Sequence, residues 1–476
     1  MKRLFLLLIL VQPLFAVVSF SDIVDLQEVY DAGLPVLSIT TVDGEEPTFD
    51  VWYAPEGCIG LSIKNATKVP ARMTISHNGN VLYDSGEYVE DKSGLTIKVR
   101  GNTSAIQHKT PYKIKLQKKA DLLNRGDNKF KDKNWALIND EDLLTMTGLK
   151  VNELVGLQWT PAYEYVNVVM NGRYRGLYML VETVERNVDC RLNVEKTGYI
   201  FEYSAYWWKE PIKLDSKFNY TMQYTYKYPD SDKVTDEQHE YLKEEVKKFE
   251  KCLPDGAYEN YIDVNSLATW MVGRDIVGCS DGAGSNIFLT KYDNTPDTKI
   301  MMGNMWDFDS AFMRTGEWDT VHDHWFFDLL FNSANKQFVT AYKRRWNDLK
   351  STLFSEMDAF LTAFANSEER KALDNSLVLD GKVAGKSVIS VIDAIEVFKQ
   401  WFSSRKIWLE EQISQLEGSE LGDVNCDGIV DKVDLNLMID YLMDKTPEDT
   451  FDVNKADVNQ DGDVNVADVV GLIKWL

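Results

Sequence analysis

Four oxygen-bearing side chains lie close to two short apolar runs in the middle of the chain. Asp281 opens a turn of small residues that reaches Asn286, and an apolar run follows directly. A second apolar run ends shortly before Asp307 and Asp309. Carboxylate and amide oxygens are the ligands that Mg²⁺ prefers, and Mg²⁺ keeps waters and substrate phosphates as its other ligands. The spacing therefore predicts a site for Mg²⁺ and phosphate at two strand ends.

A basic face is expected on two strands earlier in the chain. Residues 95–100 and 112–116 alternate apolar and charged side chains, so each strand puts its charges on one side. This alternation fits a solvated sheet face, and it equally fits cations that line a phosphate cleft. The charged side chains in question are Lys98, Arg100, Lys113 and Lys115.

The order of the predicted elements indicates an α+β protein. Strand-like segments with turn signals such as Asn78-Gly79 and Asn171-Gly172 fill the first half of the chain. The second half is rich in helical periodicity, which we assign to residues 236–251, 264–277, 336–364 and 388–416. This order favours a body of two lobes with a cleft between them.

The composition and the first residues restrict the setting of the protein. A formal net charge of −23 disfavours nucleic acid, because nucleic-acid binding depends on neutralising phosphates with Lys and Arg. Lys2 and Arg3, followed by the apolar run 4–11, are typical of an export signal, which we place at residues 1–19. No other segment is apolar enough for a membrane span. The sequence thus predicts a secreted protein.

An internal repeat near the C-terminus has the spacing of a calcium-binding loop. Residues 423–434 match residues 457–468 at an offset of 34 residues. Oxygen side chains fall at loop positions 1, 3, 5, 9 and 12, glycine falls at position 6, and position 7 offers a backbone carbonyl. Two Ca²⁺ ions are therefore predicted. Their ligands are Asp423, Asn425, Asp427, Ile429, Asp431 and Asp434 in the first loop, and Asp457, Asn459, Asp461, Asp463, Asn465 and Asp468 in the second.

These two loops resemble a type I dockerin. The resemblance covers residues 421–476 and implies a small all-α domain that binds a cohesin on a scaffoldin, as in cellulosomes. In that family, loop positions 10 and 11 help to select the partner. Here they are Lys432-Val433 and Val466-Ala467, and because the two pairs differ, a fully symmetric dual binding mode is in doubt.

Five motifs in the middle of the chain resemble the CotH family of spore-coat-type protein kinases. In order, they are IKVRGNTS from residue 97, PYKIKL from 111, NWALI from 134, NGRYRGLY from 171 and WDFD from 306. The resemblance covers residues 95–417, after a β-rich N-terminal region at 20–94. It implies an atypical, two-lobed protein-kinase-like fold that transfers the γ-phosphoryl group of ATP to Ser of a protein substrate.

The resemblance also implies a role for each matching residue. Asp281 corresponds to the catalytic-loop acid that orients the acceptor hydroxyl. Ligands for Mg²⁺ or Mn²⁺ correspond to Asn286, Asp307 and Asp309. For ATP, the resemblance implies that Lys113 or Lys115 contacts the phosphates with Arg100 close by, and that the strand end 180–182, which includes Glu182, forms the hinge beside adenine.

Two departures from the family pattern keep a second hypothesis open. The usual Arg-Asn pair is replaced in segment 144–150, and Gly282-Ala283-Gly284-Ser285 stands where an aromatic residue or His is common. Under this second hypothesis, the protein is a catalytically silent binding or structural component of a cellulosome-type complex. A third hypothesis, a polysaccharide-active enzyme, has only Trp207-Trp208 as a candidate for exposed aromatics. His322 and His324 suit a metal site or a polar loop.

Overall fold

The computed structural model describes residues 24–476, except for 218–220, 255, 334, 419–420, 427–428, 446–450 and 460. The predicted signal segment 1–19 lies outside the described residues. Strands dominate the first part of the described chain and helices the second, which confirms the α+β class.

The N-terminal part forms a β-barrel. Its eight-stranded sheet has the order β1-β9-β10-β8-β7-β6-β4-β5. It closes because β1 pairs in parallel with β9 and antiparallel with β4. Strands from both sides of residue 95 thus share one sheet. The bounds are β1 Val36–Thr41, β4 Val69–His77, β5 Asn80–Asp84, β6 Leu95–Val99, β7 Tyr112–Ala120, β8 Asp132–Ile138, β9 Tyr163–Met170 and β10 Arg173–Glu182.

Two predicted hairpins of this barrel are confirmed. Asn78 and Gly79 join β4 to β5, and Asn171 and Gly172 join β9 to β10. All four residues have positive φ, between 50° and 76°, as a two-residue hairpin turn of type I′ requires. Alternating apolar side chains of β6, β7 and β8 face the barrel interior, where Ile97, Ile114 and Trp135 are fully buried.

A five-stranded sheet of order β12-β13-β11-β14-β15 forms the centre of the second part. Its strands are β11 (Tyr199–Ser204), β12 (Lys213–Leu214), β13 (Gln223–Tyr228), β14 (Ile287–Lys291) and β15 (Ile300–Met302). Helix α3 (Asp236–Cys252) and helix α4 (Val264–Val277) occupy the two predicted helical segments. Helix α2 (Leu144–Leu154) lies between β8 and β9 in sequence and contacts α4.

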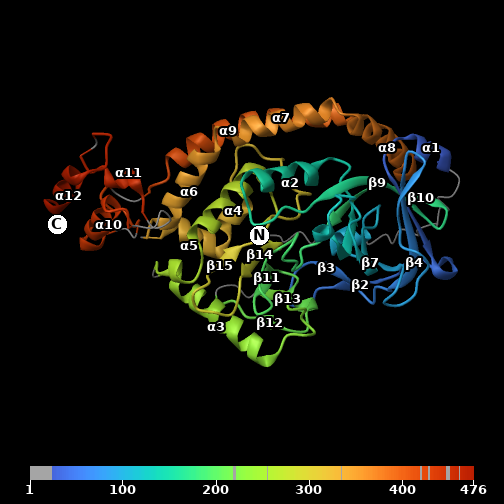
Figure 1. The fold of residues 1–476 in the computed structure, drawn as a ribbon, viewed down its shortest axis with the longest axis horizontal. Helices are drawn as coiled ribbons and strands as arrows, with labels where there is room; N and C mark the ends of the chain where they lie inside the picture. The colour runs from blue at the N-terminus through green and yellow to red at the C-terminus, as the bar shows by residue number, and fades with distance from the viewer. Residues whose placement is uncertain are drawn as a thin grey trace, which may run out of the picture.

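Long helices form an arc over the body and return to the barrel (Figure 1). Helix α9 (Val391–Ser414) occupies the predicted segment 388–416. The single helix expected at 336–364 is wrong, because α6 (Gln337–Leu349) and α7 (Leu353–Ala365) are separate helices. The hydroxyl of Thr352 donates to the carbonyl of Leu349, and such bonds compete with helix continuation.

Helix α8 (Glu368–Ala384) is not among the predicted helices. Its buried face includes Ser376, Asp380 and Gly381, so the apolar stripe that reveals a helix is interrupted. Asp380 accepts a hydrogen bond from the backbone N–H of Leu177, at 2.8 Å, and forms an ion pair with buried Lys109. This helix therefore fastens the C-terminal arc to β10.

Helix α5 (Trp325–Asn332) precedes α6, and three smaller parts of the described fold lie outside the two sheets and the helical arc. Helix α1 (Leu26–Asp31) packs on the barrel beside α8, and a two-stranded hairpin joins β2 (Asp50–Tyr53) to β3 (Leu61–Lys64). The C-terminal domain contains α10 (Lys432–Leu442), α11 (Val453–Ala456) and α12 (Val466–Ile473) around a small apolar core. This domain projects from one end of the body (Figure 1).

Candidate functional site

The structure brings Asn286 and Asp307 into direct contact. Asn286 immediately precedes β14 and Asp307 follows β15, and these two strands pair antiparallel. The Nδ2 group of Asn286 donates to Oδ2 of Asp307 at 2.8 Å. Both residues have positive φ, 62° and 70°, a conformation that costs energy in residues other than glycine and is concentrated at functional sites. The two predicted metal ligands thus meet at one point, as the strand-end argument requires.

Electrostatic repulsion among carboxylates is concentrated at this point. Burial, together with the neighbouring carboxylates of Asp309 and Asp281, raises the pKa of Asp307 to about 7 against the opposing charge of Arg100. Burial and Asp281 also raise the pKa of Asp309. Asp307 and Asp309 are nonetheless exposed to solvent. A divalent cation there would relieve the repulsion among the three carboxylates.

Asp281 is tied to the loop that carries the other carboxylates. Its Oδ1 accepts a hydrogen bond from the hydroxyl of Ser310, and Cys279 Sγ lies 3.3 Å from the same oxygen. The backbone N–H of Ser280 donates to the carbonyl of Ser310 at 3.1 Å. These bonds hold residues 279–281 against residue 310, next to Asp309.

A buried ion pair supports the loop after Asp281. Arg274 of α4 lies 3.2 Å from Asp319, and both side chains are almost completely buried. A Cβ atom on Gly282 would lie 1.5 Å from Nη2 of Arg274. Only glycine leaves room for the guanidinium at this position. The small residues of the loop, a departure from the family pattern, therefore accommodate an internal arginine.

Helix α2 supports the other side of the metal ligands. Phe308 stands between Asp307 and Asp309, and its ring is 1% exposed. A Cβ atom on Gly148 of α2 would lie 2.2–2.5 Å from three atoms of that ring. The aromatic ring thus rests directly on the helix backbone. The position of Asp307 consequently depends on a glycine in the segment that lacks the Arg-Asn pair.

The basic face forms the opposite wall of the cleft. In the register of β6 and β7, Lys98 lies directly opposite Lys113. Burial lowers the pKa of Lys98, and the nearby charges of Lys113, Lys68 and Lys115 lower it further. Like charges directly opposite each other destabilise a sheet. A bound anion would offset this repulsion, so the geometry favours the phosphate-cleft interpretation over a solvated face.

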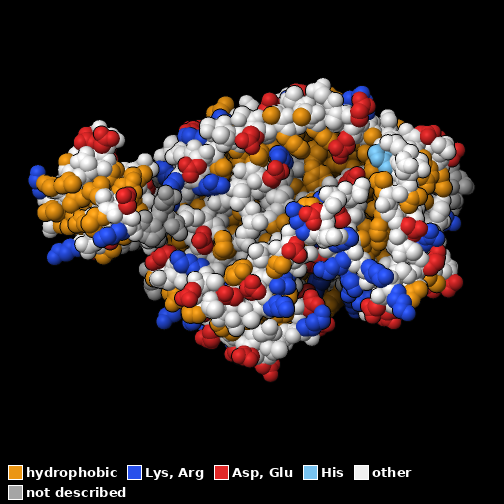
Figure 2. All heavy atoms as spheres, in the orientation of Figure 1, with side chains coloured by type: hydrophobic (Ala, Val, Ile, Leu, Met, Phe, Trp, Pro, Cys, Tyr) orange, Lys and Arg blue, Asp and Glu red, His pale blue; other side chains and the backbone are white. Residues whose placement is uncertain are grey.

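Two adjoining hollows make up the cleft between the barrel and the second sheet. One, of about 1020 Å³, is lined by Arg100, Asn286 and Trp306 among others. The other, of about 1420 Å³, extends along the lysines of β6 and β7. Figure 2 shows Lys and Arg side chains gathered around a hollow in this region. The walls shared by the two hollows are Lys113, Val184, Glu185, Glu210 and Lys227.

Arg100 and Lys113 face this cleft with different partners. The guanidinium of Arg100 lies 6.0 Å from the centre of the Trp306 ring. Lys113 forms an ion pair with Glu185 at 3.1 Å. Lys115 is exposed and lines the second hollow only. The structure thus brings Arg100 close to Asn286, and places Lys113 between the two hollows.

Glu182 is not brought to the cleft lining. Its carboxylate is 1% exposed and pairs with Arg125 at 2.9 Å. It also accepts the backbone N–H of Ala162, at 3.1 Å, so it fastens the end of β10 inside the protein. The chain next to the cleft is Thr183, Val184 and Glu185 instead. The sequence correctly predicted that β10 ends at Glu182, but the alternation of residue types does not determine which way the Glu182 side chain points.

Sequence reasoning missed Glu202 and Lys227. Glu202 of β11 accepts the backbone N–H of Asn286 at 2.9 Å and pairs with Lys227 of β13 at 2.6 Å. It therefore fixes the backbone next to a predicted metal ligand. A lone acid inside the apolar run Tyr199–Ser204 was a signal for this role.

The histidines and the tryptophan pair serve structural roles. His322 Nε2 lies 2.9 Å from both carboxylate oxygens of Asp275, and the ring stacks on Trp318. His324 is buried among aromatic rings, and burial lowers its pKa to about 3. Trp208 is 9% exposed and packs edge-on against Trp52. The two histidines therefore do not share a metal, and Trp208 is not part of an exposed groove.

In the second predicted calcium loop, Asp457 and Asp468 accept hydrogen bonds from the loop's own backbone. Asp457 accepts the backbone N–H groups of Asp461 and Gly462, at 3.0 and 2.9 Å. Asp468 accepts those of Asn459 and Asn465, at 3.0 and 2.9 Å. These bonds order the backbone of the loop around Asp457 and Asp468.

The first loop repeats this pattern 34 residues earlier. Asp434 is fully buried and accepts the backbone N–H groups of Asn425 and Asp431, at 3.2 and 2.9 Å. Ile429 exposes its side chain, as a residue that offers only its carbonyl can. The predicted ligand Asp427 lies outside the described residues. The equivalent bonds in both loops support two sites of the same design.

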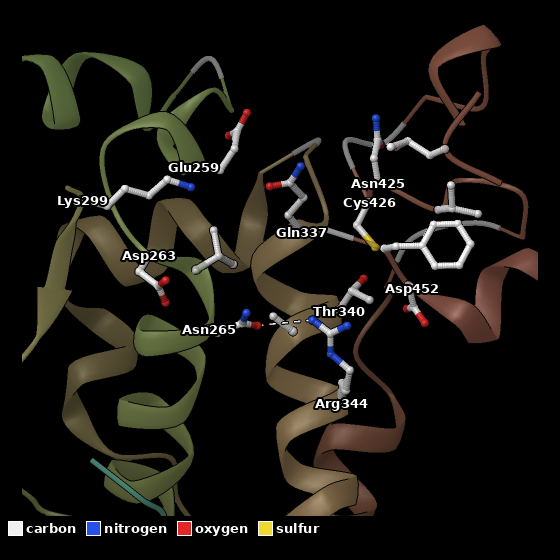
Figure 3. A pocket seen from close by; sticks show the side chains of 15 residues that line it. Glu259, Asp263, Asn265, Lys299, Gln337, Thr340, Arg344, Asn425, Cys426 and Asp452 are labelled. Carbon is white, nitrogen blue, oxygen red and sulfur yellow. Dashed lines mark hydrogen bonds between the residues drawn. The ribbon is translucent and has the colours of Figure 1, made fainter. Parts of the chain in front are cut away.

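The first loop also faces the body of the protein. Asn425 and Cys426 line a pocket together with Gln337 and Thr340 of α6 (Figure 3). The floor includes Arg344, whose Nη2 lies 3.3 Å from Oδ1 of Asn265. The two repeats consequently differ in surroundings.

The ligand set of the cleft fits a magnesium or manganese ion with a bound phosphate. Within the described ranges, no three His, Cys, Asp or Glu side chains are grouped closely enough to hold a metal ion by themselves. Mg²⁺ is commonly held by one or two carboxylates, waters and substrate phosphates. Asp307, Asp309 and the amide of Asn286 provide that kind of incomplete shell.

Comparison with known proteins identifies the family. A model described as CotH kinase protein matches residues 97–409, and one described as dockerin type I domain matches residues 421–476. The chain therefore belongs to the CotH kinase protein family and carries a type I dockerin domain. No curated protein matches it.

The dockerin defines the kind of setting in which the protein acts. Type I dockerins bind calcium, and they imply a cohesin partner in an extracellular or cell-surface complex. None of the helices in the described part of the chain is long and apolar enough to cross a membrane.

Proposed function

We propose that the protein is a secreted kinase that transfers the γ-phosphoryl group of ATP to Ser residues of a protein in the same complex. The observation that carries this proposal is the opposition of charges across one cleft. Asn286 and Asp307 offer oxygen ligands at one end, and the cations of β6 and β7 crowd together at the other. Phosphoryl transfer needs both, because the metal and the cations share the charge of the phosphates.

A two-lobed, kinase-like arrangement gives each lobe a part of this site. The barrel is the first lobe and supplies Arg100, which directly follows β6, and Lys113 of the adjacent β7. The second sheet supplies Asn286 and Asp307. Residues 183–198 connect β10 to β11, and Thr183, Val184, Glu185 and Arg186 of this segment line the cleft, which is the place of a hinge. Closure of this hinge would bring phosphates and metal ligands together.

The chemistry follows from the side chains that surround the cleft. A Mg²⁺ or Mn²⁺ ion, held by Asn286, Asp307 and Asp309, supplies positive charge to the phosphates. Arg100 and Lys113 bind phosphate oxygens, with Lys115 next to them in the basic wall. Asp281 orients the acceptor hydroxyl and takes its proton.

The dockerin determines where the reaction takes place. With Ca²⁺ in both loops, the domain binds a cohesin on a scaffoldin, and the cleft is thereby held among the other components of the complex. Serine-bearing proteins of that complex become the nearest substrates. A tethered enzyme meets them at a high effective concentration.

The test compares the purified chain with Asp307→Ala, using ATP with Mg²⁺ or Mn²⁺. We expect phosphate transfer and an ATP-dependent rise in melting temperature for the wild-type chain and neither for the variant. The matched control is Asp297→Ala, because Asp297 is an exposed acid in the loop between β14 and β15. The absence of both signals in the wild-type chain would reject the kinase.

A catalytically silent binding component is the second candidate. Its supporting observation is the hydrogen bond from Ser310 to Asp281, which occupies the acid that should receive an acceptor hydroxyl. This candidate predicts that ATP raises the melting temperature without phosphate transfer to any protein.

A further inference from the structure

Ser310 has the placement of an acceptor hydroxyl. Its Oγ donates to Oδ1 of Asp281, the acid assigned to orient the acceptor. Its residue follows Asp309 directly and lies three positions after Asp307. Ser310 is half-buried, so solvent still reaches part of the residue. A general base must lie within hydrogen-bond reach of the proton that it takes, and Asp281 meets that condition here.

Two other hydroxyl-bearing residues that line the cleft, Thr183 and Ser285, form hydrogen bonds with partners other than Asp281. Thr183 donates to Glu185 at 3.1 Å, and Ser285 accepts the amide of Asn286 at 3.0 Å. Ser310, in contrast, is held to residues 279–281 through both its hydroxyl, which also lies 2.8 Å from Cys279 Sγ, and its carbonyl, which accepts from the backbone and the hydroxyl of Ser280. Its orientation toward the acid is therefore held by the backbone of two loops.

We propose that Ser310 is phosphorylated by the same chain that contains it. This inference rests on the proposed function and names one acceptor for it. Ser310 Oγ forms a bond to the γ-phosphorus of ATP, and the bond from that phosphorus to the β,γ-bridging oxygen breaks. The hydroxyl proton passes to Asp281, and ADP leaves with the bonding electrons. The product places a phosphate next to three carboxylates, so it needs a cation nearby or a shift of the loop.

The sequence provides an unambiguous readout. Trypsin cleaves after Lys299 and Arg314, and the peptide 300–314 contains Ser310 as its only Ser, Thr or Tyr. Phosphate on this peptide therefore identifies the site without fragmentation. The mass of the peptide is measured in the full-length protein as purified, and again after incubation with ATP and Mn²⁺.

We expect the phosphopeptide from the wild-type chain and none from Ser310→Ala or Asp307→Ala. Ser310→Thr keeps the hydroxyl and should restore phosphate on the same peptide. Because the transfer is within one chain, the fraction modified per minute should not change when the protein is diluted tenfold. A fraction that falls in proportion to the dilution would overturn the assignment to a single chain.

Two further measurements separate the inference from the proposed function. If the peptide stays unmodified while dephosphorylated casein, used as a serine-rich probe, is labelled, Ser310 is not an acceptor and the kinase stands. If nothing is labelled and ATP does not change the melting temperature, both fail together. Mn²⁺ affinity by electron paramagnetic resonance should stay within about twofold in Ser310→Ala, since Ser310 is not a ligand. A larger loss of Mn²⁺ affinity would show that Ser310 supports the metal site, and it would overturn the proposed role of Ser310 as an acceptor.

Discussion

Gly148→Ala tests whether helix α2 positions the metal ligands. The new Cβ would lie 2.2 Å from Cδ1, 2.4 Å from Cγ and 2.5 Å from Cε1 of the Phe308 ring. Contacts below 3.0 Å do not persist, so either the ring or the helix must move. Because Phe308 is 1% exposed and stands between Asp307 and Asp309, a shift of the ring changes the direction of both carboxylates.

The expected magnitude is a balance of two effects. Overpacking of a buried site costs about 1–3 kcal/mol. Alanine is favoured over glycine inside a helix by about 1 kcal/mol. Three ring atoms overlap here, so we expect a net loss of about 1–2 kcal/mol in the free energy of unfolding. Displacement of groups that orient metal ligands typically reduces metal affinity by about 10-fold or more, and we expect that loss for Mn²⁺.

The assay combines urea unfolding with a Mn²⁺ titration in the presence of ATP. The control is Gly316→Ala, whose Cβ would meet nothing closer than Trp408 Nε1 at 3.9 Å. The control should bind Mn²⁺ like the wild-type chain. If Gly148→Ala were more stable than the wild type, or bound Mn²⁺ with unchanged affinity, the support of Asp307 through Phe308 would be refuted.

Three other perturbations have defined outcomes. Burial, and then neighbouring carboxylates, raise the pKa of Asp307 to about 7. A raised pKa stabilises the folded state at low pH, so the contribution of Asp307 to the melting temperature in EDTA should be lost as the pH rises from about 4 through 7. Stabilisation by Mn²⁺ should grow over the same interval, because the ion binds the deprotonated carboxylate. Melting temperatures of the wild-type chain that match those of Asp307→Asn at every pH would contradict this expectation. Gly282→Ala places its Cβ 1.5 Å from Nη2 of Arg274, and should cost about 3–5 kcal/mol in urea unfolding by breaking a buried ion pair. In Gly284→Ala the new Cβ has its nearest contact at 3.6 Å, so the free energy of unfolding should stay within about 0.5 kcal/mol of the wild-type value. Equal losses of stability in the Gly282 and Gly284 variants would contradict the steric role of Gly282. Asp468→Ala should reduce the Ca²⁺-dependent helicity measured by circular dichroism. If EDTA left the helicity or the cohesin binding of the wild-type chain unchanged, the prediction of two calcium sites would be contradicted.

The calcium loops were predictable from sequence because their geometry is local. All ligands of a loop lie within twelve residues, and the repeat at 34 residues gives the same bonds twice. Strands β6 and β7, with their alternating side chains, and the two hairpin turns could be predicted for the same reason. Backbone periodicity and positive-φ residues determine these features within a few positions.

The cleft depended on tertiary structure. Arg100 and Asn286 are far apart in sequence, and only the closure of the barrel against the second sheet brings them to one hollow. The repulsion between Lys98 and Lys113 depends on strand register, which alternation alone does not fix. Glu182 shows the same limit, because its carboxylate turns inward to Arg125.

The sequence by itself determined the residue types that hold calcium and those that suit magnesium and phosphate. The tertiary structure decided which of them meet. It joined Asn286 to Asp307 through the pairing of β14 with β15, and set Phe308 against Gly148 through the packing of α2. The physical reason is that side-chain chemistry and local backbone preference are properties of short segments, whereas contact between distant segments depends on how the whole core packs.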